Sequence, residues 1–426
     1  NHTPINGELG SFYRPDGLLA NSDLKWETTI SRNLGLDFGF LNNRINGSLE
    51  IYWNTTKDLL MAVPVDNTTG YSYQFQNFGK TSNRGIELSL NFDVINKGDF
   101  RFNIGAIYNY NRNKLDELPN ADQYLYSSYW GSSSLVPTND YMFVEGKAIG
   151  LVRGFVSEGF YTVNDFRYEN GQYILKEGIP DITKALTATY MHPFNIPNGQ
   201  TAFPGAAKFR DVNNSGTVDL DDATCLGEVM PRHTGSFQLN FNYKNFDLSS
   251  NFNWTAGGKV YNVAAMINAS GQEFDGIGAQ RTSWVADTYK VYNVNSSGDL
   301  YAVTDPNELN ALNANAKYHL PYHQSGITSS EWLEDGSYLR LQTLTLGYTL
   351  PHTVLNKIHI EKLRIYLTAT NLFTITGYSG IDPEVNATPT GQSGFYSNLR
   401  VFPTLNMDFG TYPRARTFTL GGNITF

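Results

Sequence analysis

The amino-acid sequence predicts an all-β protein, and more specifically a transmembrane antiparallel β-barrel. Three observations support this fold class. Alternation of apolar and polar residues recurs in about ten or eleven segments along the chain. Between these segments short turns alternate with long loops, which is the arrangement found in outer-membrane barrels. Aromatic residues make up 14% of the chain, a share that suits the aromatic girdles at the two edges of a membrane-spanning wall.

The last eleven residues, Arg416 to Phe426, show the pattern most clearly. Phe418, Leu420 and Ile424 alternate with small or polar residues, so a strand here has one apolar face and one polar face. At about 3.3 Å per residue and a tilt near 45°, such a strand covers roughly the 25 Å apolar height of an outer-membrane wall. Soluble sandwiches also contain alternating strands, so the prediction depends on the recurrence of this pattern along the chain.

Strands of similar length are expected from one end of the chain to the other. The first covers residues 26–40, and a turn containing Asn42 and Asn43 leads to its partner at residues 45–53. Further strands are expected over residues 86–92, 100–110, 235–243, 246–255, 338–350 and 363–369, with weaker candidates over 148–161 and 206–210 and a short helix over 260–268. Long extracellular loops are expected over about 111–147, 162–205, 256–336 and 377–415.

Composition excludes several other classes of protein. No apolar run approaches the length of about 18 residues that a membrane-spanning helix needs. With a net charge of −9 and no basic patch in the sequence, binding to nucleic acid is not expected. The single Cys225 excludes an intrachain disulfide and disfavours a thiolate metal site. The seven histidines lack metal-ligand spacing, and no catalytic motif or organic-cofactor motif is present, so no enzymatic activity is expected.

An acidic loop over residues 211–222 matches the spacing of a calcium-binding loop. Oxygen-bearing residues occupy positions 1, 3, 5, 7, 9 and 12 of this loop, namely Asp211, Asn213, Ser215, Thr217, Asp219 and Asp222. Gly216 at the sixth position permits the sharp turn that such a loop makes around a hard cation. Position 12 is an aspartate rather than a longer, bidentate glutamate, and the loop follows a strand rather than a helix. Calcium is predicted here, with an Asx-rich surface turn as the alternative.

Eight short motifs are spread over nearly the whole chain. They are Leu24-Lys25-Trp26-Glu27-Thr28-Thr29, Asn77-Phe78-Gly79, Asn83-Arg84-Gly85-Ile86-Glu87-Leu88, Lys208-Phe209-Arg210-Asp211, Gly336-Ser337-Tyr338-Leu339-Arg340-Leu341, Leu346-Gly347-Tyr348, Ala369-Thr370-Asn371-Leu372-Phe373 and Tyr412-Pro413-Arg414. In this order they resemble the SusC/RagA-like branch of the TonB-dependent outer-membrane transporters, and their number makes the resemblance specific.

This resemblance implies a barrel of about 22 strands whose lumen is plugged by an N-terminal domain. Because the chain shows about half of those strands and opens without a plug or a signal peptide, we expect residues 1–426 to be the C-terminal half of the barrel. The implied location is the outer membrane of a Gram-negative, Bacteroidetes-type bacterium. The implied function is TonB-dependent import of oligosaccharides or peptides. The implied partners are a SusD-like surface lipoprotein that closes over the mouth, TonB acting through the N-terminal part, and membrane lipid or lipopolysaccharide.

Several aromatic residues are candidates for a direct role. Tyr129, Trp130, Trp284 and Trp332 lie in expected outer loops, where aromatic rings can stack on sugar faces. Packing within the loops or a position at the lipid interface is the alternative for each. Phe426 resembles the C-terminal aromatic residue that the barrel-assembly machinery recognises. The competing interpretation of the whole chain is a soluble, secreted all-β module that binds carbohydrate on aromatic loops. That interpretation predicts strands whose apolar faces pack against one another.

Overall fold

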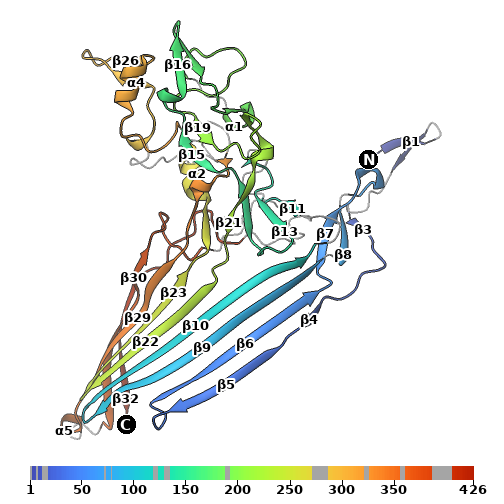
Figure 1. Ribbon diagram of the computed structural model, residues 1–426. Helices are drawn as coiled ribbons and strands as arrows, with labels where there is room; N and C mark the ends of the chain where they lie inside the picture. Colours follow the sequence, from blue (N-terminus) through green and yellow to red (C-terminus); the bar gives the residue numbers. More distant parts are fainter. Residues whose placement is uncertain are drawn as a thin grey trace.

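The main feature of the protein is a long antiparallel sheet. The computed structural model describes residues 2–5, 8–11, 18–71, 73–77, 79–118, 123–128, 135–187, 192–270, 286–320, 326–355, 360–385 and 405–426. Within these residues ten strands form one sheet in the order β32–β30–β29–β23–β22–β10–β9–β6, with β4 and β5 both pairing with β6 at one edge. The strands lie side by side and slanted, and we call this sheet the wall (Figure 1). The prediction of an antiparallel barrel wall is confirmed.

The wall contains all the strands that the sequence predicts, apart from the two weaker candidates at 148–161 and 206–210. Its strands are β4 (Thr28–Ile30), β5 (Asn33–Phe40), β6 (Ile45–Lys57), β9 (Lys80–Lys97), β10 (Phe100–Glu117), β22 (His233–Tyr243), β23 (Phe246–Ala256), β29 (Tyr338–Thr349), β30 (Lys362–Thr376) and β32 (Thr417–Thr425). The loop expected from residue 111 begins only after Glu117, because β10 continues to that residue. Backbone hydrogen bonding continues past the point where the apolar alternation ends, so polar residues extend β6, β9 and β10.

Short turns connect the strands at one end of the wall, the lower end in Figure 1. Leu41, Asn42 and Asn43 all have positive φ in the β5–β6 turn, a conformation that asparagine tolerates better than most residues. Gly98 with φ of 58° forms the β9–β10 turn, and helix α5 (His352–Leu355) lies between β29 and β30. Short turns mark the periplasmic end of an outer-membrane barrel, so the opposite end is extracellular.

The long connections fold into a lobe above the extracellular end of the wall (Figure 1). The remaining strands are β1 (His2–Ile5), β2 (Glu8–Ser11), β3 (Leu18–Leu19), β7 (Leu60–Pro64), β8 (Tyr73–Asn77), β11 (Gln123–Tyr126), β12 (Leu135–Val136), β13 (Tyr141–Val144), β14 (Leu151–Gly154), β15 (Ser157–Phe160), β16 (Phe166–Glu169), β17 (Gln172–Leu175), β18 (Asp181–Ile182), β19 (Ala207–Phe209), β20 (Thr217–Val218), β21 (Thr224–Glu228), β24 (Lys259–Asn262), β25 (Tyr292–Val294), β26 (Leu300–Ala302), β27 (Gly326–Ile327), β28 (Leu333–Asp335) and β31 (Met407–Asp408). The helices are α1 (Lys184–Thr187), α2 (Val263–Ser270) and α4 (Pro306–Leu312).

Two sequence predictions change in this lobe. The weaker strand candidates at 148–161 and 206–210 are strands of small sheets, β14, β15 and β19, and none of these belongs to the wall. The helix expected from residue 260 begins at Val263, because residues 259–262 form β24. The side chain of Asn262 accepts a hydrogen bond from the backbone N–H of Ala265 at 2.9 Å, and so caps the start of α2.

Buried side chains gather at and above the extracellular end, and the wall has an exposed apolar face. Two large buried clusters contain lobe residues such as Tyr141 and Phe155. On the wall, by contrast, Leu34 is 65% exposed, Leu420 is 76% exposed and Phe418 is 65% exposed. Apolar columns exposed in this way require a lipid environment. This finding contradicts the soluble alternative, which needed those columns to pack together.

Two rows of aromatic side chains mark the edges of the apolar band. Near the periplasmic turns the rings of Phe246 and Tyr348 lie 4.6 Å apart, and near the lobe those of Tyr110 and His233 lie 5.1 Å apart. Phe100 and Tyr110 lie ten positions apart on β10. That separation is about 34 Å along a strand, or roughly 24 Å of height at a tilt near 45°. The band therefore matches the apolar thickness of an outer membrane.

No helix among the residues that the structure describes is both long and apolar enough to cross a membrane.

Candidate functional site

The polar face of the wall carries hydrogen-bonding side chains that lie opposite the lipid-facing columns. Ser249 donates to Asn240 across strands at 2.8 Å, and the hydroxyls of Thr345 and Thr368 lie 2.9 Å apart. Side chains alternate along each strand, so this face becomes the lumen when the wall closes into a barrel. The lumen surface is therefore rich in uncharged donors and acceptors.

Charged residues on this lumen face include an ion pair and a pair of neighbouring glutamates. Arg364 pairs with Asp247, and the pair lies over Gly347. A side chain at position 347 would crowd the pair, because its Cβ would come within 2.5 Å of both Arg364 and Asp247. Near the other edge, Glu50 and Glu87 are direct cross-strand partners. An open hollow surrounds this pair, lined by Ser31, Arg32, Asn33, Glu50, Tyr52, Asn54, Asn83, Glu87 and Asn111.

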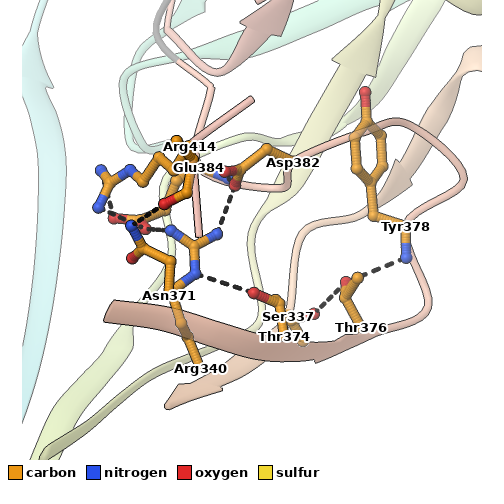
Figure 2. Close-up of polar contacts among 10 residues, drawn as sticks. Ser337, Arg340, Asn371, Thr374, Thr376, Tyr378, Asp382, Glu384 and Arg414 are labelled. Carbon is orange, nitrogen blue, oxygen red and sulfur yellow. Dashed lines mark hydrogen bonds and ion pairs between the residues drawn. The ribbon is translucent and has the colours of Figure 1, made fainter. Parts of the chain in front are cut away.

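A buried ionic network lies at the extracellular mouth, on the lumen side of β29 and β30. Figure 2 shows Arg340 of β29 at its centre. The guanidinium donates to Thr374 at 2.9 Å, to Asp382 at 2.5 Å and to Glu384 at 2.5 Å. Glu384 also pairs with Arg414, at 3.2 Å. Arg340 is 2% exposed, so the strength of these bonds is not diluted by water.

This network, which we call the mouth network, holds two loop segments onto the wall. Residues 377–385 follow β30, and residues 405–416 precede β32, so the network fixes both ends of the last long loop. The side-chain amide of Asn371 adds a bond to the carbonyl of Ala415, at 3.1 Å. A cavity of about 240 Å³ lies beside the network, and Thr255, Tyr338 and Arg414 are among its lining residues.

Family-like motifs that are far apart in sequence meet in the mouth network. Arg340, Asn371 and Arg414 come from three of the eight motifs. Sequence analysis found these motifs but did not predict that their polar residues contact one another. Asp382 and Glu384 belong to none of the eight motifs, so their part in the network was not predicted from the sequence. A buried arginine in an alternating strand, followed by an acidic pair in the next loop, is the signal that could have found them.

A second pair of motifs meets at the other edge of the wall. Asn77 accepts a bond from the backbone N–H of Lys25 at 2.7 Å and donates to the carbonyls of Lys25 and Asp58, at 2.8 Å and 2.9 Å. Glu27 accepts from the backbone N–H of Leu60 at 2.7 Å. The motifs beginning at Leu24 and Asn77 therefore stabilise one junction at the extracellular end of β6.

The motif Lys208-Phe209-Arg210-Asp211 anchors the lobe. Lys208 pairs with Asp165 at 2.8 Å and lies over the ring of Tyr161, while Phe209 is buried against Phe155. These contacts fix the strand from which the predicted calcium loop begins.

The predicted calcium loop is closed by its own backbone. Both carboxylate oxygens of Asp211 accept backbone N–H bonds, from Ser215 at 3.1 Å and Gly216 at 2.7 Å. Asp222 is fully buried and accepts from Val212 and Asp219. Among the described residues, no group of three or more His, Cys, Asp or Glu side chains is placed to hold a metal. Each carboxylate oxygen of Asp211 accepts one backbone bond and keeps a second lone pair, so the loop retains capacity for a cation.

The predicted substrate-binding aromatics have different outcomes. Tyr129, Trp130 and Trp284 lie outside the described residues. Trp332 is 4% exposed and belongs to the buried cluster that contains Tyr126 and Tyr141. In this conformation its ring offers no free face for stacking on a sugar, because the lobe packs around it.

Two acids in the lobe, one fully buried and one partly buried, were not predicted from the sequence. Asp140 is fully buried and accepts from the backbone N–H and the hydroxyl of Ser128, at 2.7 Å and 2.5 Å. Burial raises the pKa of Asp140 to about 7, although the hydrogen bonds from Ser128 act to lower it. Burial also raises the pKa of Glu331, and the nearby His319 opposes that shift. A run of apolar neighbours around an acid is a weak signal, so neither residue could be identified from the sequence.

A slanted antiparallel wall with one lipid-facing side and one polar side, roofed by loops that are fixed at its mouth, defines an outer-membrane β-barrel receptor. The family described as "TonB dependent receptor-like, beta-barrel" matches residues 3–372. The chain belongs to this family, and within it the chain is SusC/RagA-like. It is accordingly an outer-membrane protein of the Bacteroidetes type.

Similar proteins extend over almost the whole chain. TonB-dependent receptor P3 of Formosa agariphila is 30% identical over 407 residues, which cover 96% of this chain and 35% of that protein. TonB-dependent receptor SusC of Bacteroides thetaiotaomicron is 27% identical over 431 residues, covering 99% of this chain and 34% of that protein. The RagAB peptide transporter structure has a TM-score of 0.64 at 21% identity, covering 100% of this chain and 38% of that one. The chain thus spans about a third of the length of these curated relatives.

Proposed function

We propose that this chain forms part of the barrel of a TonB-dependent importer in the outer membrane. The observation that supports this most directly is the two-faced wall, which has apolar columns toward lipid and a polar, hydrogen-bonding face toward a lumen. A wall of this kind encloses a polar passage and excludes lipid from it. The mouth network keeps the last long loop at the entrance of that passage.

The proposed cargo is an oligosaccharide or a peptide. Both classes present many uncharged hydrogen-bonding groups, and the lumen face offers amide and hydroxyl partners for them, such as those of Asn240, Ser249 and Thr368. The similarity to the RagAB peptide transporter supports a peptide, and the uncharged lumen groups suit a glycan as well. Tyr129, Trp130 and Trp284 remain proposed contacts for sugar rings.

The proposed partners are a SusD-like surface lipoprotein and TonB. The lipoprotein would close over the lobe, and TonB would supply energy through the N-terminal part of the transporter. The contribution of this chain is the wall, the outer loops and the surface toward the lipoprotein. No chemical step on the cargo is proposed.

Growth of a deletion strain tests the function. Loss of the gene should abolish growth on one class of nutrient, single glycans or defined peptides, when that nutrient limits growth. Complementation should require TonB. Normal growth of the deletion strain on every glycan and peptide tested, together with unchanged uptake of labelled cargo, would overturn the proposal. Defective growth on peptides alone would exclude the glycan alternative.

A further inference from the structure

Two arginines on the lipid-facing side of the wall lie next to each other without an acidic partner. Arg84 of β9 and Arg112 of β10 are direct cross-strand partners, and both side chains are exposed. Neither makes a side-chain hydrogen bond or ion pair with another described residue. Like charges directly opposite each other on one sheet face are destabilising. An anion at this place would remove that repulsion.

The strand pattern shows that these arginines face outward. Arg84 lies two positions beyond Ile86, and Arg112 lies two positions beyond Tyr110, so each shares a face with its apolar neighbour. Ile86 and Tyr110 are themselves cross-strand partners in the lipid-facing columns. The carboxylates of Glu50 and Glu87 belong to the opposite, lumen face and cannot neutralise the pair.

The height of the pair on the wall matches the head-group layer. Arg112 is twelve positions from Phe100 of the periplasmic aromatic row, and Tyr110 of the upper row is ten positions from it. The arginines therefore lie roughly 5 Å above the upper aromatic row, where the hydrocarbon ends and the polar layer of the outer leaflet begins. Trp53, the partner of Arg84 on β6, lies at the same height as the arginines and has an aromatic ring that suits this layer.

The acids nearest along the strands are already paired. Asp116 lies 3.3 Å from Lys114, and Glu117 lies 2.7 Å from Lys80. These two lysines therefore balance the two carboxylates at the end of β10, and Arg84 and Arg112 remain as two uncompensated charges in this part of the described wall. Guanidinium groups bind phosphate oxygens with paired N–H donors, which makes phosphate the anion that fits best.

We propose that Arg84 and Arg112 bind the phosphate group of an outer-leaflet lipid of the lipid A class. The site fixes the wall within the outer leaflet at the edge of its hydrocarbon layer. It rests on the membrane position of the wall and not on the import of any cargo. Failure of the lipid site and failure of the proposed import are therefore distinguishable, because lipid binding is measured on purified protein and import on cells.

Co-purification of lipid is the first test. The whole protein is extracted from outer membranes in mild detergent, and lipid A phosphorus is measured per molecule of protein. Arg84→Gln/Arg112→Gln should bind the lipid roughly thirtyfold more weakly, and it should lose most of the co-purified phosphorus. Arg84→Lys/Arg112→Lys should retain an intermediate amount, since it keeps charge but loses the paired donors. If the double glutamine variant does not reach the membrane, each single variant should show a partial loss.

The second test identifies the source of the phosphate. Lipid-depleted wild-type protein is heated with lipid A in micelles, with the same lipid after enzymatic removal of phosphate, or with inorganic phosphate. The intact lipid should raise the melting temperature, whereas the dephosphorylated lipid and inorganic phosphate should raise it far less. Equal stabilisation by inorganic phosphate would overturn the lipid assignment.

A control variant separates the site from general surface charge. Arg167→Gln/Lys290→Gln removes two exposed positive charges from the lobe, above the membrane layer, and should leave both the bound phosphorus and the melting response unchanged. Equal phosphorus content in wild type and Arg84→Gln/Arg112→Gln would overturn the proposal. An equal loss in the control variant would do the same.

Discussion

The guanidinium of Arg340 donates to the carboxylate of Asp382 at 2.5 Å, and the two side chains are 2% and 8% exposed. Arg340 belongs to a wall strand, whereas Asp382 belongs to the loop after the next strand. An ion pair taken out of water is retained only when its geometry is good and its remaining donors are satisfied, as they are here by Thr374 and Glu384. The pair therefore couples the position of the last loop to the wall.

Arg340→Met should release that loop. The substitution leaves the buried Asp382 and the partly exposed Glu384 with fewer partners. The loss of one member of a buried pair, here Arg340 and Asp382, costs about 3–5 kcal/mol. We expect a lower melting temperature in detergent and faster proteolytic cleavage between residues 377 and 415. Arg414→Met is the matched control, since Arg414 is 46% exposed in its side chain and pairs with the same Glu384. The control should cost at most about 1 kcal/mol. Equal protease protection in Arg340→Met and wild type would contradict the coupling.

The wall could be predicted from the sequence because lipid imposes a simple rule on it. Every second residue of a wall strand contacts hydrocarbon, so alternation in segments such as Phe418 to Ile424 identifies both the strand and its faces. The extensions of β9 and β10 could not be predicted, because backbone pairing beyond the membrane needs no apolar pattern. The lobe was predicted only as loops, since its short strands depend on contacts between distant segments.

The candidate site was predictable only in part, for the same reason. The motifs containing Arg340, Asn371 and Arg414 were visible in the sequence, but their convergence follows from the register of β29 and β30 and the path of the loop. Trp332 illustrates the limit for aromatic residues. Its type and loop position suited a sugar platform, yet the ring is buried, and burial depends on segments far away in the sequence.

The stability of the folded protein should decrease as the pH rises, because the pKa of Asp140 is raised in the folded state. Its pKa in the folded protein is about 7, above its ordinary value of 3.8. Between these values the folded state holds a proton that the unfolded state has released. The associated stabilisation is therefore complete below about pH 4 and is lost as pH rises to about 7. The shift corresponds to at most roughly 4 kcal/mol.

Thermal unfolding at pH 5 and pH 8 measures this effect, followed by tryptophan fluorescence because Trp332 lies in the same lobe. The wild type should melt at a lower temperature at pH 8. Asp140→Asn should remove most of that difference, and Asp140→Asn/Glu331→Gln should remove more, since the pKa of Glu331 is also raised by burial. An unchanged pH slope in Asp140→Asn would contradict the assignment.

Calcium should bind the loop that begins at Asp211. Because both oxygens of this carboxylate accept only single backbone bonds, each has a further lone pair for a cation. Metal analysis of protein purified in calcium should give about one ion per molecule, and Asp211→Ala should lose it. Asp299→Ala, an acid in a loop between β25 and β26, is the control and should keep the ion. Calcium content that is the same in all three proteins would rule out this site.

Deletion of Phe426 should prevent insertion of the barrel. This residue directly follows β32 and is 88% exposed, and we propose it as the aromatic residue that the assembly machinery recognises. Cell fractionation should show little of the deleted protein in the outer membrane, while Phe426→Tyr should insert normally. Phe418→Ala, a lipid-facing change in the same strand, controls for loss of an aromatic residue alone. Normal outer-membrane levels after the deletion would refute the assembly role.

Gly235→Ala should disturb the upper aromatic row. Gly235 lies between Tyr108 and Trp254 on neighbouring strands, and the Trp254 ring crosses over it to stack on Tyr108 with centroids 6.1 Å apart. A Cβ at this position would lie 2.4 Å from the carbonyl oxygen of Ile107 and 2.7 Å from the Trp254 ring, so either the ring or the backbone must move. Overpacking of this kind costs about 1–3 kcal/mol, and the melting temperature in detergent should fall accordingly. Gly105→Ala provides the comparison, because its Cβ would meet only side chains, those of Asn91 at 3.4 Å and Gln238 at 3.9 Å, and this variant should melt close to the wild type. A Gly235→Ala protein with the wild-type melting temperature would show that the Trp254 ring does not need the space that this glycine leaves.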